Sequence, residues 1–131
     1  MASVFTRVLG GELPGRFVHR DERAAAFLTI APINPGHVLV VPVQEVDSWT
    51  DLEPDLAAHV FLVAQRVAKA VEAVYSPRRV GLVVAGLEVP HAHLHVVPFD
   101  SEDELSFARA RSDVPAEELD EVQRRLIDAF R

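Results

Sequence analysis

The stretch Pro90-His91-Ala92-His93-Leu94-His95-Val96-Val97-Pro98 decides the fold of this chain. Its three histidines alternate with alanine, leucine and valine over consecutive positions. Successive side chains of an extended strand point to opposite faces, so His91, His93 and His95 would share one face. The pattern therefore predicts a strand with three imidazoles on one side and an apolar surface on the other.

Three histidines on one face have three interpretations. They can be incidental residues on a solvated face, ligands of a metal such as Zn²⁺, or groups that act on a phosphate. A metal site is disfavoured because the nearest carboxylates, Glu88 and Asp100, stand at no supporting spacing. Phosphate chemistry is favoured because a neutral imidazole is a nucleophile and an imidazole N–H donates to phosphoryl oxygens.

The composition is typical of a globular protein of one domain. The chain has 131 residues, 49% hydrophobic and 25% charged, with a formal net charge of −7. This negative charge disfavours binding to nucleic acid or to an anionic membrane surface. The absence of cysteine excludes disulfides and thiolate metal ligands. Because there is no long apolar run and no leader-like N-terminus, we expect a cytoplasmic protein without a membrane partner.

Hydrophobic periodicity along the rest of the chain predicts an α+β fold with about five mainly antiparallel strands. A short helix is expected over residues 3–9, with Ser3 as its N-cap, and one long helix over 54–75. A C-terminal helix should begin near Pro115, and one helical turn is expected within 45–49. Besides the histidine stretch, the expected strands are 17–20, 24–30, 37–42 and 79–85, the last two buried on both faces.

The histidine stretch resembles the signature of the histidine-triad (HIT) nucleotide-binding family, in which histidines alternate with hydrophobic residues. The resemblance covers about residues 3–99. It implies a HIT-like fold, a homodimer with a sheet continuous across both subunits, and hydrolysis or transfer of nucleotidyl groups. Further landmarks of the family follow in the same order at Gly11–Pro14, Ala26–Ile30, Pro35–Pro42 and Leu52–Pro54.

The resemblance also implies roles for individual residues. His93 would attack the α-phosphorus and form a nucleotidyl-histidine intermediate, and His95 would donate to the phosphate or the leaving group. His91 would orient His93 through its backbone, and His37 would lie beside them as a fourth histidine. The ligand would be a nucleotide with a purine monophosphate moiety. The residues expected to bind it are Phe5, Val8, Phe27, Thr29, Ile30, Leu87 and Glu88.

No cofactor and no metal are expected. Some members of the family hold zinc through paired cysteines, and Ser3 and Thr6 occupy those positions here. A metal-dependent hydrolase is therefore the least favoured of the possible functions.

Three departures from the family pattern concern substrate recognition. Thr29 stands where many members have an aspartate that binds the ribose. Leu87 stands where many have a glutamine that contacts the phosphate, and the carboxylate of Glu88 follows it. The link between the strand expected at 79–85 and the histidines is also short. These changes leave open a non-catalytic, nucleotide-binding regulatory dimer as the alternative function.

The segment 100–131 lies outside the resemblance and holds ten acidic residues against five arginines. We expect it to form an acidic helical extension packed on a core of residues 3–99, so that residues 1–131 make one domain. The alternative is a role in substrate gating, for which Phe107, Arg109 and Arg111 stand close enough to the histidines in sequence.

Overall fold

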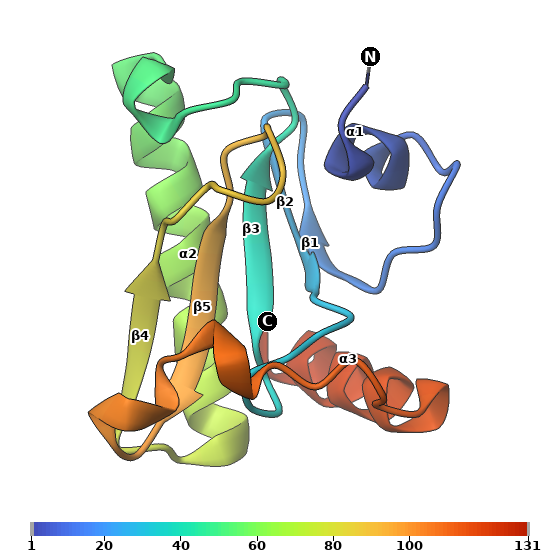
Figure 1. The fold of residues 1–131 in the computed structure, drawn as a ribbon, viewed down its shortest axis with the longest axis vertical. Helices are drawn as coiled ribbons and strands as arrows, with labels where there is room; N and C mark the ends of the chain where they lie inside the picture. The colour runs from blue at the N-terminus through green and yellow to red at the C-terminus, as the bar shows by residue number, and fades with distance from the viewer. Residues whose placement is uncertain (1, 131) are drawn as a thin grey trace.

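A five-stranded sheet forms the centre of the computed structural model, which describes residues 2–130 (Figure 1). The strand order is β1-β2-β3-β5-β4, and every neighbouring pair is antiparallel. The prediction of an α+β fold with five mainly antiparallel strands is therefore confirmed. The strands are β1 (Phe17–Arg20), β2 (Ala24–Leu28), β3 (Val38–Pro42), β4 (Arg79–Val83) and β5 (Leu94–Phe99).

The helices begin where local capping signals predict. The side chain of Ser3 accepts a hydrogen bond from the N–H of Thr6 and caps α1 (Val4–Leu9). Pro54 opens α2 (Pro54–Tyr75). The turn expected within 45–49 is misplaced, because Ser48 instead caps a short 3₁₀ helix, η1 (Trp49–Asp51). The remaining helices are η2 (Glu102–Glu104), η3 (Phe107–Arg109) and α3 (Ala116–Phe130).

The two faces of the sheet carry separate apolar clusters. Behind the sheet in Figure 1, α2 buries valines at helical spacing, such as Val63 and Val67, against Val40 of β3. The alternate β3 residue Leu39 points to the opposite face and packs with Phe5 of α1. Strand β3 is thus buried on both faces, as its apolar run predicts. Among the described residues, no helix is long and apolar enough to span a membrane.

The C-terminal helix α3 packs on the α2 side of the sheet. Its residues Leu119, Val122 and Leu126 are buried in the same cluster as the α2 valines, and Leu126 is fully buried. The Gln123 amide donates to the C=O of Phe17 in β1 at 2.9 Å. The C-terminal helix expected to begin near Pro115 is thus confirmed.

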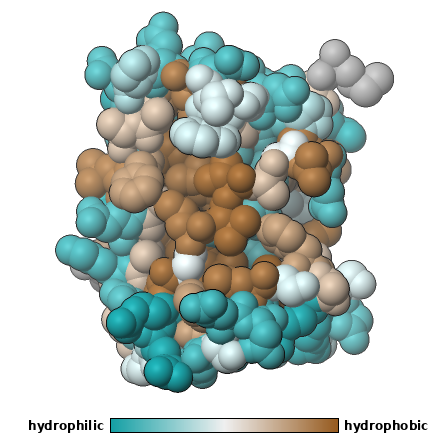
Figure 2. Space-filling view, turned by 60° about the vertical axis from the view of Figure 1, so that its left-hand side comes forward, coloured by the Kyte–Doolittle hydropathy of each residue, from teal (hydrophilic) through white to brown (hydrophobic). Residues whose placement is uncertain are grey.

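Strand β4 differs from its prediction in length and burial. It ends at Val83 and forms an edge of the sheet, and Leu82 is 41% exposed. An apolar run alone does not distinguish a central strand from an edge strand with an uncovered apolar face. Figure 2 brings this side of the molecule forward and shows hydrophobic side chains gathered across its middle. Phe61 of α2 and Leu82 line a hollow there.

The prediction of one regular strand through all three histidines is wrong. Strand β5 begins at Leu94, so His91 and His93 lie before it. The N–H of His91 bonds to the C=O of Val89 in a turn, and the N–H of Ala92 bonds to Val46 outside any strand. These two bonds replace the ladder that an extended stretch would have formed.

Candidate active site

Four histidines meet on the face of the sheet opposite α2. Leu39 of β3 pairs with His95 of β5, which brings His37, two residues before Leu39, beside His95. The ring centroids of His37 and His95 are 5.2 Å apart, and those of His93 and His95 are 4.9 Å apart. The bend before β5 adds His91, so the structure brings together all four histidines that the sequence singles out.

Backbone contacts fix the proton positions of His37 and His95. The N–H of Ile33 donates to Nδ1 of His37 at 3.0 Å, so that nitrogen carries no proton. His37 must therefore donate from Nε2 to Nδ1 of His95, at 3.0 Å. The remaining proton of a neutral His95 is on Nε2, where it is available to a ligand.

A second chain of contacts fixes His91 and His93. The C=O of Pro42 can only accept, so His91 carries its proton on Nε2, 2.8 Å away. The C=O of His91 likewise accepts from Nδ1–H of His93 at 2.7 Å. A neutral His93 then has a lone pair on Nε2, the position required of a nucleophile.

Burial keeps three of the four rings neutral. Burial lowers the pKa of His37 to about 3, with a smaller effect from the neighbouring His95. It lowers the pKa of His95 to about 4, again with a smaller effect from His93. Burial also lowers the pKa of His91 below its usual value. At neutral pH these rings therefore act as hydrogen-bonding groups rather than cations.

A hollow of about 500 Å³ opens beside the histidines and extends under α1. Its aromatic part is formed by Phe5, whose ring centroid lies 4.9 Å from that of His93 and 5.6 Å from that of Phe27. An adjoining hollow of about 250 Å³ contains Leu87 and the rings of His37, His93 and His95. The residues expected to bind a nucleotide therefore surround the histidines, and their binding roles stay predictions. Those in the larger hollow are Phe5, Val8, Phe27, Thr29, Ile30 and Glu88.

The residues that depart from the family pattern are among those that line these hollows. The hydroxyl of Thr29 accepts from the N–H of Ala31 at 3.1 Å, so it is partly used within its own turn. Leu87 is 93% exposed and Glu88 lines both hollows. The smaller hollow has no lysine or arginine among its described lining residues, whereas Arg16 lines the larger one. Donors for a phosphate in the smaller hollow must therefore come from imidazole, from backbone N–H groups or from the hydroxyl of Thr29.

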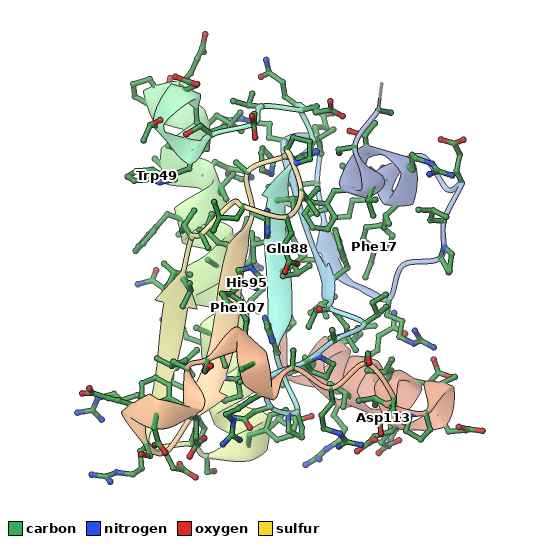
Figure 3. All side chains as sticks on the ribbon, in the orientation of Figure 1. Phe17, Trp49, Glu88, His95, Phe107 and Asp113 are labelled. Atoms are coloured by element: carbon green, nitrogen blue, oxygen red, sulfur yellow. The ribbon has the colours of Figure 1, made fainter. Side chains whose placement is uncertain are left out.

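The segment after β5 also reaches the site. The ring of Phe107 packs edge-on against His95, with centroids 4.8 Å apart, and Figure 3 shows it beside His95. Arg109 donates to Oδ1 of Asn34 at 3.1 Å, and the Asn34 amide donates to the C=O of Pro98 at 2.9 Å. The expected approach of Phe107 is thus present, and a role in gating stays a prediction.

Two further residues, Ser3 and Thr6, contact His91, and a third, Glu45, bonds to both of them. Ser3 and Thr6 of the α1 region, with Glu45 after β3, form hydrogen bonds around the ring of His91. In the sequence, Ser3 is marked as a helix cap and, with Thr6, as standing where some relatives have paired cysteines, whereas Glu45, 42 positions after Ser3, is not marked at all. No periodicity or motif marks the long-range contact between Glu45 and Ser3.

The comparisons with known proteins agree with this geometry. The model of the HIT domain matches residues 10–102. An uncharacterized HIT-like protein of Borreliella burgdorferi is 30% identical over 113 residues, 81% of each chain. The asymmetrical bis(5'-nucleosyl)-tetraphosphatase of Schizosaccharomyces pombe is 38% identical over 85 residues, 61% of this chain and 47% of that protein. A zinc-bound histidine triad family protein of Mycobacterium smegmatis has a TM-score of 0.84 and 30% identity, with 99% and 94% of the two chains covered.

The residues of this chain do not fit a zinc site around His91. The donors nearest its Nδ1 are the hydroxyls of Ser3 and Thr6, which are not among the ligands that zinc prefers. These hydroxyls are already hydrogen-bonded to protein groups. Within residues 2–130, no three His, Asp or Glu side chains are grouped to hold a metal.

Proposed function

Since the chain belongs to the HIT domain family, we propose that it is a nucleotidyl hydrolase or transferase in which His93 attacks the α-phosphorus of a nucleotide. The observation that carries this proposal is the 2.7 Å hydrogen bond from Nδ1–H of His93 to the C=O of His91. In this bond Nδ1 of His93 is the donor, so the lone pair is on Nε2 of the same ring, which lines the smaller hollow. The tetraphosphatase among the relatives supports a hydrolytic activity.

The first step forms a bond from Nε2 of His93 to phosphorus while the bond to the leaving group breaks. The leaving group departs with that electron pair and takes a proton from solvent. The His93 ring becomes positively charged, and the C=O of His91 stabilises this charge through Nδ1–H. The Nε2–H of neutral His95 donates to a phosphoryl oxygen.

The second step returns the enzyme to its starting state. Water attacks phosphorus, the bond between phosphorus and Nε2 breaks, and its electron pair returns to His93. The attacking water loses a proton to solvent, so the net reaction is hydrolysis. When the hydroxyl group of an acceptor molecule replaces water, the same step is nucleotidyl transfer.

We propose a homodimer through the β4 edge, because the exposed Leu82 and Phe61 would be covered by a second copy. The apolar middle of the face in Figure 2 supports this surface. We also propose that residues 1–131 form one domain, with a core over 3–99 and the acidic extension 100–131, because Leu126 is buried among the α2 valines. A cytoplasmic location stays a prediction from the sequence.

The second candidate is a nucleotide-binding dimer that does not turn over its ligand. It is favoured by the exposed Leu87 and by the lack of lysine or arginine among the described residues that line the smaller hollow. Such a site holds the base in the hollow under α1 but contacts the phosphate weakly. The nucleotide would then act as a regulatory ligand.

One set of assays separates these functions. The purified chain is incubated with adenosine 5'-phosphoramidate, and AMP release is measured for the wild type, His93→Ala and the control His59→Ala, which lies outside the site. Turnover that His93→Ala abolishes and His59→Ala retains supports the proposal. Calorimetric binding of AMP without any turnover by the wild type supports the regulatory dimer. Turnover that a chelator abolishes indicates a metal-dependent hydrolase instead.

A further inference from the structure

The ring of His91 is completely buried, and both of its nitrogens are hydrogen-bonded. Nε2 lies 2.8 Å from the C=O of Pro42, and Nδ1 lies 2.8 Å from Oγ of Ser3. Since the ring donates to Pro42, it must accept from the Ser3 hydroxyl. A buried imidazole with both nitrogens bonded is fixed in orientation as well as in tautomer.

The hydroxyl of Ser3 is itself held in place. It accepts from the N–H of Thr6 at 3.0 Å. Its single proton has two possible acceptors, Nδ1 of His91 at 2.8 Å and the hydroxyl oxygen of Thr6 at 3.3 Å, and the shorter contact assigns it to His91. One oxygen of Glu45, Oε1, accepts from the N–H of Ser3 at 2.8 Å and from the hydroxyl of Thr6 at 2.6 Å. The carboxylate of Glu45 therefore fixes the first turn of α1 against His91.

The peptide group between His91 and Ala92 is held from both sides. Its N–H donates to the C=O of Val46 at 2.7 Å, and its C=O accepts from Nδ1–H of His93 at 2.7 Å. Val46 follows Glu45 directly, so the same short segment after β3 fixes both the Ser3 contact and this peptide. A change in the position of His91 would therefore be transmitted to the ring of His93.

We propose that Ser3, Thr6 and Glu45 are positioning residues that hold His91 by hydrogen bonds alone, and through it the attacking ring of His93. We call this set the His91 clip. The bonds that join its members to His91 and to one another are hydrogen bonds between protein groups. The effect of the clip on the reaction rate rests on the proposed function, whereas its effect on the positions of the His91 and His93 rings does not.

The ionised form of Glu45 suits this role. The N–H of Ser3 and the hydroxyl of Thr6 lower the pKa of Glu45, chiefly through the backbone bond. The carboxylate thus remains an acceptor for both donors throughout the neutral range. Glutamine retains one such acceptor oxygen, whereas alanine retains none.

The kinetic test compares Glu45→Ala and Thr6→Val with Glu45→Gln. Ser3→Ala is less informative, since it also removes the cap of α1. With adenosine 5'-phosphoramidate, the first two variants should lower kcat by about 10- to 100-fold, because a small misplacement of a reacting group is enough. KM should stay near the wild-type value, since neither side chain lines the nucleotide hollow. Glu45→Gln should recover most of kcat.

The control is Glu53→Ala. Glu53 precedes α2 and its side chain makes no capping hydrogen bond, so its loss removes a surface carboxylate from outside the clip. Wild-type kcat in Glu53→Ala and reduced kcat in Glu45→Ala and Thr6→Val support the proposal. Unchanged kcat in Glu45→Ala and Thr6→Val overturns it.

A ring-specific measurement decides the proposal even when the wild type shows no turnover. Nitrogen-15 NMR of the histidine rings should identify Nε2–H for His91 and Nδ1–H for His93 in the wild type. In Glu45→Ala the signals of both rings should shift or broaden, while those of His59 stay in place. An inactive wild type refutes the proposed function, and unchanged His91 and His93 signals in Glu45→Ala refute the clip.

Discussion

Acidification from pH 7 to pH 5 should destabilise the fold chiefly through His37 and His95, whose rings share a hydrogen bond. Burial lowers the pKa of His37 to about 3 and that of His95 to about 4, against an ordinary value near 6.5. Below pH 6.5 these two histidines therefore become protonated in the unfolded chain but stay neutral in the folded chain. The stability that these neutral rings contribute is complete above pH 6.5 and is lost as the pH falls toward 4.

The size of this effect follows from the two pKa values. Between pH 7 and pH 5 the unfolded chain gains about 2 kcal/mol from protonation of each ring, while the folded chain gains almost nothing, so the expected loss is about 4 kcal/mol. This range lies above the ordinary pKa values of the carboxyl groups, which contribute little to the change. Such a loss is a large part of the stability of a typical domain.

Urea unfolding followed by circular dichroism at pH 7, 6 and 5 measures the effect. His37→Gln provides the matched variant, because its amide can still donate to Nδ1 of His95 but does not titrate. It should lose the contribution of His37, about 2 kcal/mol, while His95 and His91 keep theirs. A free energy of unfolding that is flat or rises from pH 7 to pH 5 refutes the assignment of neutral, buried rings.

Three further perturbations have expected outcomes. Phe107→Ala removes the edge-on contact with His95. Turnover kinetics should show a KM raised by about two- to tenfold, which corresponds to the interaction energy of one aromatic pair. An unchanged KM excludes Phe107 from the substrate site. Leu82→Arg places a charge on the exposed edge strand β4. Light scattering should show a monomer where the wild type is a dimer, and the circular dichroism spectrum should not change. A dimer that persists in this variant shows that the interface is not at β4. Leu126→Ala leaves a cavity at a fully buried position between α3 and α2. The free energy of unfolding, measured with urea, should fall by about 2–5 kcal/mol. A fall of less than about 1 kcal/mol shows that α3 is not part of the cooperative core.

The parts of the fold with local signals could be predicted from the sequence. Ser3 caps α1 and Pro54 opens α2 as their residue types indicate, and the valine spacing of α2 predicts its buried side. The alternation of His93, Leu94 and His95 also predicts that the two imidazoles lie together, which their neighbouring rings confirm. Short-range patterns are sufficient for such features because the partners are only a few positions apart.

The parts that depend on distant partners could not be predicted. His91 leaves the expected strand because the N–H of Ala92 finds its acceptor at Val46, in a segment far away in the sequence. The contact between Glu45 and Ser3 spans 42 positions and has no sequence pattern. The exposure of β4 likewise depends on its place at the sheet edge, which an apolar run does not reveal.

The central claim is that Nε2 of His93 forms a bond to phosphorus. The most direct measurement is a single-turnover reaction with excess enzyme and adenosine 5'-phosphoramidate, quenched at a series of times and analysed by peptide mass spectrometry. The account predicts an adenylyl group on His93 that appears before AMP and then decays, and that is absent from His93→Ala. Release of AMP while the peptide containing His93 stays unmodified at every time, or an adduct on another residue, would contradict it.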